Sequence, residues 1–298
     1  MSVTDPDTAG SFASPPPGLW HRPGFKRFRK HRLAVFGAAT ILFLSLACIV
    51  GPWLLPYADT FIDIRARFSP PFSRPHILGT DPLGRDILAR LLMAGRISLA
   101  VGFSAMIISM AIGVCVGVVA GYVEGVVGAT LMRFVDAMLS FPSIFLLLAI
   151  SALIQPSVPS IVILIAMTSW MEVARVVEAQ IRSLKTREFA QAAISFGASD
   201  TRIMFRELLP NAVAPIVVAA TLNVAHAILA ESYISFLGYG IQPPTPSWGN
   251  MLDSAQSYLT SAPWLAIIPG AAITLAVTSF NFVGDGLRDA LDPRMDLP

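Results

Sequence analysis

The chain has 298 residues, of which 54% are hydrophobic and only 13% are charged, and its formal net charge is +2. Soluble domains carry about a quarter of their residues as charged side chains, so the composition argues against a soluble globular protein, and the near-neutral balance does not favour a nucleic-acid partner. A chain surrounded by lipid can be apolar outside as well as inside, which predicts an integral membrane protein.

Six apolar runs are long enough for a helix to cross the hydrocarbon core, which needs about 20 residues. Together they take up nearly half of the chain, so we expect an all-α membrane protein without a large soluble domain. Pro142, Pro215 and Pro269 fall inside runs and are expected to bend them. The expected spans are residues 33–55, 97–122, 134–155, 158–177, 212–237 and 264–284.

Basic residues predict the orientation of the spans. Residues 21–32 contain six Lys or Arg side chains directly before the first run, so this side is expected to be cytoplasmic, and six spans place both termini there. The outer loop that follows the first run holds six arginines and is the one exception to this rule. The expected organisation is a cytoplasmic tail (1–32), a six-helix domain (33–284) with outer loops 56–96 and 238–263 and a cytoplasmic loop 178–211, and a cytoplasmic tail (285–298).

The first outer loop contains a candidate amphipathic helix at residues 81–92. Asp81 can cap this helix, Pro82 is tolerated in its first turn, and its leucine and isoleucine side chains share one face. We expect the helix either to lie on the outer membrane surface or to pack on the protein's own outer face.

The second run carries a small residue at every fourth position. Such a ridge lets two helix backbones approach closely in lipid, so we interpret it as a packing device. Its members are Ala105, Ser109, Gly113, Gly117 and Gly121.

The cytoplasmic segment 178–211 is far too long for a tight turn. Residues 188–196 favour a helix that Gly197 stops, and Ser199 can cap a second short helix that runs to Leu209 before Pro210. Small residues around the turn favour a rigid knob that docks on a partner protein, and the alternative is a re-entrant helix that packs on the bundle. The candidate apolar anchors of this element are Phe189, Ile194, Phe196, Ile203 and Phe205.

The same segment resembles the EAA loop of ATP-binding-cassette (ABC) importer permeases, whose pattern is Glu-Ala-Ala, three residues, Gly, and later Ile and Leu-Pro. Two positions depart from that pattern, because Gln191 replaces the Glu of the triplet and Glu207 stands where His is common. In that family the loop forms coupling helices that insert into a cleft of a cytoplasmic ATPase subunit. The resemblance assigns this coupling role to Glu188, Phe189, Gln191, Ala192, Ala193, Gly197, Ala198, Ser199, Ile203 and Pro210.

Three further motifs extend the resemblance over residues 25–295. They resemble the dipeptide, oligopeptide and nickel branch of these permeases, in particular its second permease subunit, which implies a type I ABC importer fold in the bacterial inner membrane. The motifs are Leu78-Gly79-Thr80-Asp81-Pro82-Leu83-Gly84-Arg85-Asp86, Met132-Arg133-Phe134-Val135-Asp136 with Phe141-Pro142, and Pro246-Ser247-Trp248-Gly249.

The resemblance implies several partners and a class of cargo. The expected partners are a second homologous permease, two ABC ATPase subunits, an extracytoplasmic binding protein and the lipid bilayer. The chain has no Gly-x-x-x-x-Gly-Lys-[Ser/Thr] phosphate loop, so we expect no bound cofactor here, with ATP and Mg used by the partner ATPases. Di- or oligopeptides are the first expectation for the cargo, and nickel or another small solute is the alternative.

Polar side chains at membrane depth are costly and usually face the bundle interior or water, so they are candidate pathway residues. Asn223, His226 and Glu231 on the fifth run are the most central, and for each a structural hydrogen bond is the competing interpretation. For Asp136, Glu172 and Arg175, nearer the ends of runs, we expect hydration or ion pairing.

Two other classes of function fit less well. An ion-coupled secondary transporter is expected to show related halves with broken helices, and an intramembrane enzyme needs a catalytic pair or a His-Glu-x-x-His helix. The sequence shows no convincing internal repeat and no such constellation, so we expect no catalytic residues and no metal site. Trp248 and Trp264 are expected to be aromatic anchors at the outer interface.

Overall fold

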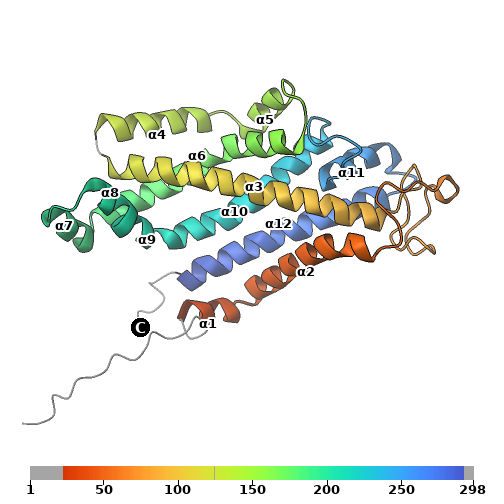
Figure 1. Cartoon of the computed structure of the whole chain (residues 1–298), viewed down its shortest axis with the longest axis horizontal. Helices are drawn as coiled ribbons and strands as arrows, with labels where there is room; N and C mark the ends of the chain where they lie inside the picture. The colour runs from red at the N-terminus through yellow and green to blue at the C-terminus, as the bar shows by residue number, and fades with distance from the viewer. Residues whose placement is uncertain (1–22, 124, 292–298) are drawn as a thin grey trace, which may run out of the picture.

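A computed structural model describes residues 23–123 and 125–291, which form a bundle of long helices (Figure 1). One end of the bundle carries α7, α8 and α9 and is called the α7 end. The other end carries α11 and the segment 55–86 and is called the α11 end. The predicted tails are described only in part, and their residues Arg22 and Arg294 lie outside the described residues. The elements are α1 (Pro23–Lys30), α2 (Arg32–Leu54), η2 (Ile64–Ala66), α3 (Ile87–Tyr122), α4 (Val126–Leu139), α5 (Ser143–Ser151), α6 (Val158–Lys185), α7 (Glu188–Ser195), α8 (Asp200–Arg202), η3 (Ile203–Leu208), α9 (Leu209–Asn211), α10 (Val213–Phe236), α11 (Trp248–Ala255), η4 (Gln256–Tyr258) and α12 (Trp264–Leu291).

Five helices in the described part of the chain are long and apolar enough to cross a membrane, which confirms five of the predicted runs. They are α2, α3, α6, α10 and α12. The helices α6 and α12 extend beyond the predicted spans, past residues 177 and 284 to Lys185 and Leu291. Hydropathy marks where a chain leaves the hydrocarbon, whereas a helix can continue into water as long as its backbone hydrogen bonds are kept.

The third predicted run, residues 134–155, is not one straight helix. The structure divides it between α4 and α5, which meet at an angle of 78°, and the membrane-crossing count reaches six only if this bent pair is one span. Pro142 occupies the N-cap of α5 in an extended conformation, because proline cannot donate the helical hydrogen bond and disfavours a helical residue before it. Pro215 and Pro269, in contrast, lie inside continuous helices, near the beginnings of α10 and α12.

The separate surface helix predicted at 81–92 is also wrong. The helix begins only at Ile87, where the Asp86 side chain accepts a hydrogen bond from the Ala89 N–H at 2.8 Å, and then runs without a break through the second predicted span. Asp81 does not cap it. Its carboxylate instead closes the preceding turn by accepting from the backbone N–H groups of Leu83 and Arg85 at 2.8 and 2.9 Å.

The ridge of small residues on α3 packs against α6, as predicted. A Cβ on Gly117 would lie 2.6 Å from the Ala174 carbonyl oxygen and 2.7 Å from the Val177 Cβ, distances that real side chains do not adopt. Gly113 and Gly121 are equally close to α6 one turn away on either side. The close contact of the two helices therefore depends on glycine, which has no side chain, at these positions.

Trp248 lies in the core and not at the membrane interface, so that prediction is wrong. Its side chain is 1% exposed, and its indole Nε1 donates to the Leu91 carbonyl at 3.1 Å. The reason is tertiary, because α11 contacts α3, α10 and α12, and Trp248 packs in one core cluster with residues of these three helices. At the centre of the bundle, α10 contacts α3, α6 and α12.

Candidate functional site

The connection between α6 and α10 forms the α7 end of the molecule. It is shorter than the predicted 178–211, because the first eight of those residues belong to α6. The predicted helix before Gly197 is present as α7, and Gly197 ends it with a φ of +74°. The Ala198 N–H then donates to the Ala193 carbonyl at 3.1 Å, which satisfies one of the last carbonyls of the helix.

The second predicted helix differs from the expectation at both ends. Ser199 occupies the N-cap of α8, but its side chain makes no capping hydrogen bond. The helix also does not stop before Pro210, since a π-helical stretch, η3, continues into α9, and Pro210 sits in the first turn of α9. Proline has no N–H to donate, and a local π-helical adjustment is one of the ways in which a helix accommodates that loss.

The predicted apolar anchors divide into a buried and an exposed set. Ile203 is buried against the ends of α3 and α6 together with Ala190 and Leu208, so it holds the element on the bundle. Phe196 is 91% exposed and stands at the tip of the turn. The other exposed members are Phe189, Ile194 and Phe205.

The remaining predicted coupling residues surround the same turn. Ala193 and Ala198 are half-buried, and Pro210 in α9 is exposed. Four others are exposed: Glu188, Gln191, Ala192 and Ser199.

Two polar contacts fasten this element to the long helices. The Tyr122 hydroxyl at the end of α3 donates to Asp200 Oδ1 at 2.6 Å, and Gln191 Nε2 donates to the Lys185 carbonyl at the end of α6 at 2.9 Å. The first contact joins residues far apart in the chain, so no local sequence signal could have found it. The element is thus hydrogen-bonded to the ends of both helices.

Two of the three candidate pathway residues point into the bundle. Asn223 Oδ1 accepts from the Ser109 hydroxyl at 2.8 Å, and Glu231, fully buried, accepts from Ser98 at 2.9 Å and from Ser235 at 2.7 Å. The bonds from Ser98 and Ser109 tie α10 to α3, which is the structural interpretation that the sequence left open.

His226 differs from them because its side chain is 63% exposed. Its Nδ1 lies 3.9 Å from Glu172 Oε2, and the Glu172 side chain is itself 58% exposed. Glu172 lies near the middle of α6 and not near its end, because α6 is longer than predicted. Farther along, Asp136 of α4 forms the expected ion pair with Arg175 of α6.

These four side chains, Asp136, Glu172, Arg175 and His226, are here called the polar stripe. They expose charged or polar atoms on α6 and α10, which are apolar enough to cross a membrane, and on α4, which qualifies only together with α5. Among the described residues, no group of three His, Cys, Asp or Glu side chains is placed to hold a metal ion.

Comparison with known proteins gives two matching families. Residues 113–297 match the family described as binding-protein-dependent transport system inner membrane component, and residues 18–71 match the N-terminal TM domain of oligopeptide transport permease C. The chain is similar to the dipeptide transport system permease protein of Alkalihalophilus pseudofirmus, with 41% identity over 291 residues, 95% of this chain and 94% of the relative. It is similar to the di/tripeptide transport system permease protein of Pseudomonas aeruginosa, with 38% identity over 278 residues and 91% of each chain. A Brucella suis protein whose name assigns it provisionally to the peptide permeases is 42% identical over 273 residues, 91% of this chain and 90% of the relative.

Proposed function

Because this chain belongs to the binding-protein-dependent transport system inner membrane component family, we propose that it forms, with a second related permease, the pathway by which an ABC importer takes up di- or oligopeptides. The family consists of transport permeases and not of enzymes. The names of the dipeptide and di/tripeptide relatives support peptides over nickel as the cargo.

The α7 end faces the cytoplasm in this proposal, and the binding protein docks at the α11 end. Lys and Arg accumulate on the cytoplasmic side of membrane proteins. The α7 end carries Arg182, Arg187 and Arg202, and the basic helix α1 lies at the same end (Figure 1). Both termini then lie on the cytoplasmic side of the bacterial inner membrane.

The exposed tip of the turn is the proposed contact with the ATPase. Phe196 is 91% exposed on an element whose other side is anchored by Ile203 and by the Tyr122 to Asp200 hydrogen bond. A large apolar side chain held rigidly in water is typical of an interface anchor. This observation carries the proposal, because it combines a free docking surface with a mechanical link to α3 and α6.

The polar stripe is the proposed lining of the pathway. A charged side chain at the centre of a lipid-facing helix costs about 2.5–3.5 kcal/mol on insertion scales, so Glu172 and His226 are not expected to face lipid. They would face either water in the pathway or the second permease. When the partner ATPases close on ATP and Mg, the α7 element would move α3 and α6 and open this face alternately to each side.

Co-purification of the tagged chain from its host tests the assembly. The expected companions are a second permease and ATPases with phosphate-binding loops. A Phe196→Asp variant should lose the ATPases, because a charge replaces the anchor, and should keep the second permease and normal folding.

Phe72 provides a matched control, since it is 87% exposed at the α11 end. A Phe72→Asp variant should retain the ATPases. Equal retention by both variants, or ATP-independent peptide uptake by the chain alone in vesicles, would contradict the proposal.

A further inference from the structure

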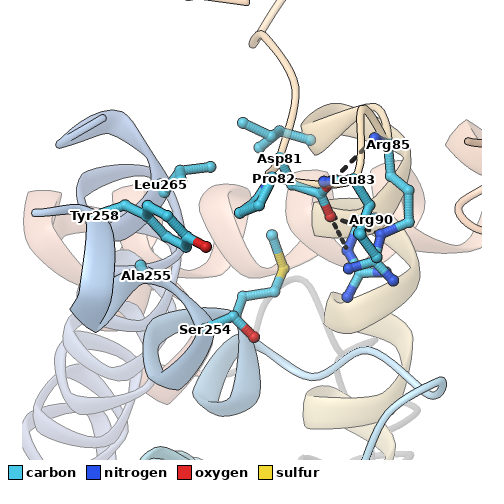
Figure 2. A pocket seen from close by; sticks show the side chains of 11 residues that line it. Asp81, Pro82, Leu83, Arg85, Arg90, Ser254, Ala255, Tyr258 and Leu265 are labelled. Carbon is cyan, nitrogen blue, oxygen red and sulfur yellow. Dashed lines mark hydrogen bonds and ion pairs between the residues drawn. The ribbon is translucent and has the colours of Figure 1, made fainter. Parts of the chain in front are cut away.

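A cavity at the α11 end lies apart from the α7 element and from the polar stripe. Its volume is about 240 Å³, and its walls come from the turn before α3, the first turn of α3, α11, η4 and the beginning of α12 (Figure 2). The volume is several times the roughly 30 Å³ that a water molecule occupies in the liquid, so it can hold a small organic group.

Arg90 is the least satisfied group in the wall of this cavity. The residue is 5% exposed, and its Nη1 is buried without a hydrogen-bond partner among the described residues. Its Nε lies 3.7 Å from Asp81 Oδ2, beyond hydrogen-bond distance. A buried guanidinium with free N–H groups is costly unless something else accepts from it.

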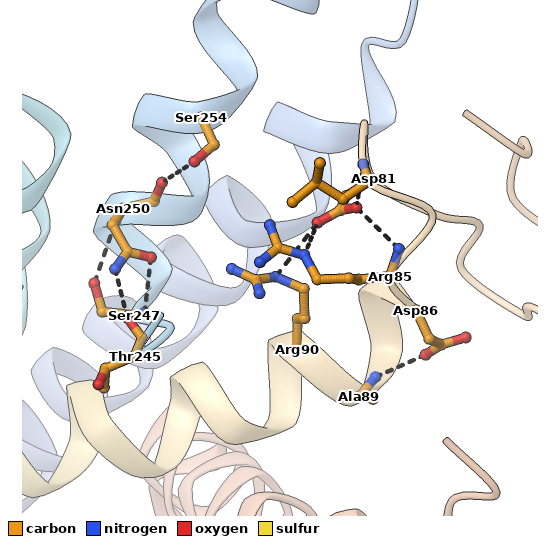
Figure 3. A network of polar contacts seen from close by, with 10 residues as sticks. Asp81, Arg85, Asp86, Ala89, Arg90, Thr245, Ser247, Asn250 and Ser254 are labelled. Carbon is orange, nitrogen blue, oxygen red and sulfur yellow. Dashed lines mark hydrogen bonds and ion pairs between the residues drawn. The ribbon is translucent and has the colours of Figure 1, made fainter. Parts of the chain in front are cut away.

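Asp81 cannot fully meet that need, because its oxygens are already in use. Oδ1 accepts from the backbone N–H groups of Leu83 and Arg85, and Oδ2 accepts from Arg85 Nε at 2.6 Å (Figure 3). Two guanidinium groups in the cavity wall thus share one carboxylate. Asp59 adds a second negative field at Arg90, but it does not line the cavity.

The other residues that line the cavity indicate what kind of ligand fits beside Arg90. Ile87, Met251 and Leu265 are apolar, while the Tyr258 hydroxyl points into the cavity from the side opposite Arg90 (Figure 2). The planar fork of arginine pairs best with a carboxylate, through two parallel hydrogen bonds. We propose that this cavity binds one carboxylate group carried on a small apolar body.

Two sources can supply such a group at this end of the molecule. One is the C-terminal residue of a free peptide, and the other is an acidic side chain of a protein docked on the α11 end. The proposal stands on the geometry of the cavity and does not depend on the α7 element, so the binding test below can fail or succeed independently of the transport proposal.

The test uses the full chain purified in detergent, with butyrate as the probe and butyramide as its uncharged counterpart. Butyrate should raise the melting temperature in a saturable manner, and butyramide should not, because only the carboxylate pairs with Arg90. Arg90→Gln should weaken butyrate binding at least tenfold. Ala255→Leu fills the cavity from α11 with every charge intact and should also abolish binding, which covers the case in which loss of Arg90 disturbs folding.

Arg65→Gln is the matched control, because Arg65 is exposed in the same loop and does not line the cavity. It should bind butyrate within twofold of the parent chain. Equal stabilisation by butyramide, or unchanged binding in both Arg90→Gln and Ala255→Leu, would overturn the proposal.

Competition then identifies the source of the carboxylate. Displacement of butyrate by the dipeptide Ala-Leu, but not by its C-terminal amide, supports a free peptide. Displacement by the purified binding protein alone supports an acidic side chain of that protein. Displacement by neither would overturn the assignment of the carboxylate to these two sources.

Discussion

Replacing Gly197 by alanine should uncouple ATP hydrolysis from uptake without unfolding the chain. Gly197 has a φ of +74°, and a Cβ placed on it meets no atom within 4 Å. Alanine therefore causes no clash in this chain, and its cost is that of the left-handed conformation, about 1–2 kcal/mol. That energy lowers the population of the native turn by a factor of about 5–30 relative to its alternatives.

The assay is performed on the assembled transporter in proteoliposomes, with peptide uptake and ATP hydrolysis measured separately. We expect uptake per ATP to fall at least fivefold, while the melting temperature falls by only the few degrees that about 1–2 kcal/mol implies and the co-purified subunits remain those of the parent. The fall follows because the turn joins the exposed Phe196 to the part of the element fastened on α3 and α6.

Gly238 offers a control with the same strain at the other end of the molecule. Its φ is +81°, and a Cβ there also meets nothing within 4 Å. Gly238→Ala should leave uptake per ATP unchanged. An equal loss in both variants, or normal coupling in Gly197→Ala, would refute the view that the geometry of this particular turn transmits the motion.

Three further outcomes test the bundle and the polar stripe. Gly117→Leu should lower the free energy of unfolding by about 1–3 kcal/mol, because it overpacks the contact between α3 and α6; titration with SDS followed by helix content measures it. Glu231→Ala should lower the free energy of unfolding by about 2–5 kcal/mol in the same titration, since it leaves a cavity and two buried serine hydroxyls without their acceptor. A decrease no larger than that caused by Glu231→Gln would argue against this reason. Glu172→Leu and His226→Leu should change the unfolding free energy by less than about 0.5 kcal/mol, because both side chains are exposed, yet reduce peptide uptake; normal uptake in both would remove the stripe from the pathway.

Local sequence signals predicted most of the fold correctly. Length and hydropathy identify α2, α3, α6, α10 and α12, because a span needs only enough consecutive apolar residues. The end of α7 at Gly197 was also predicted from the sequence, since glycine is the residue that tolerates the left-handed conformation at a helix end. The bend at Pro142 was predicted as a bend, but its size, which divides one span into two helices, was not.

The family pattern located the α7 element but not how it is held. The contact between Tyr122 and Asp200 connects two distant segments, and the burial of Ile203 depends on where the ends of α3 and α6 fall. Neither is encoded in the spacing of residues 188–210. The π-helical hydrogen bonding before Pro210 is likewise not foreseen by helical periodicity alone.

The sequence by itself determined that the chain is a helical membrane protein of the permease type and that its centre holds a few polar residues. Only the tertiary structure decided what those residues do. Asn223 and Glu231 point into the bundle and accept hydrogen bonds from serine hydroxyls on α3. His226 lies on the same helix, but its side chain is exposed and lies beside Glu172 of α6. The direction of a polar side chain at membrane depth is set by the nearest partner on a neighbouring helix, and the pairing of helices is not contained in the periodicity of any one of them.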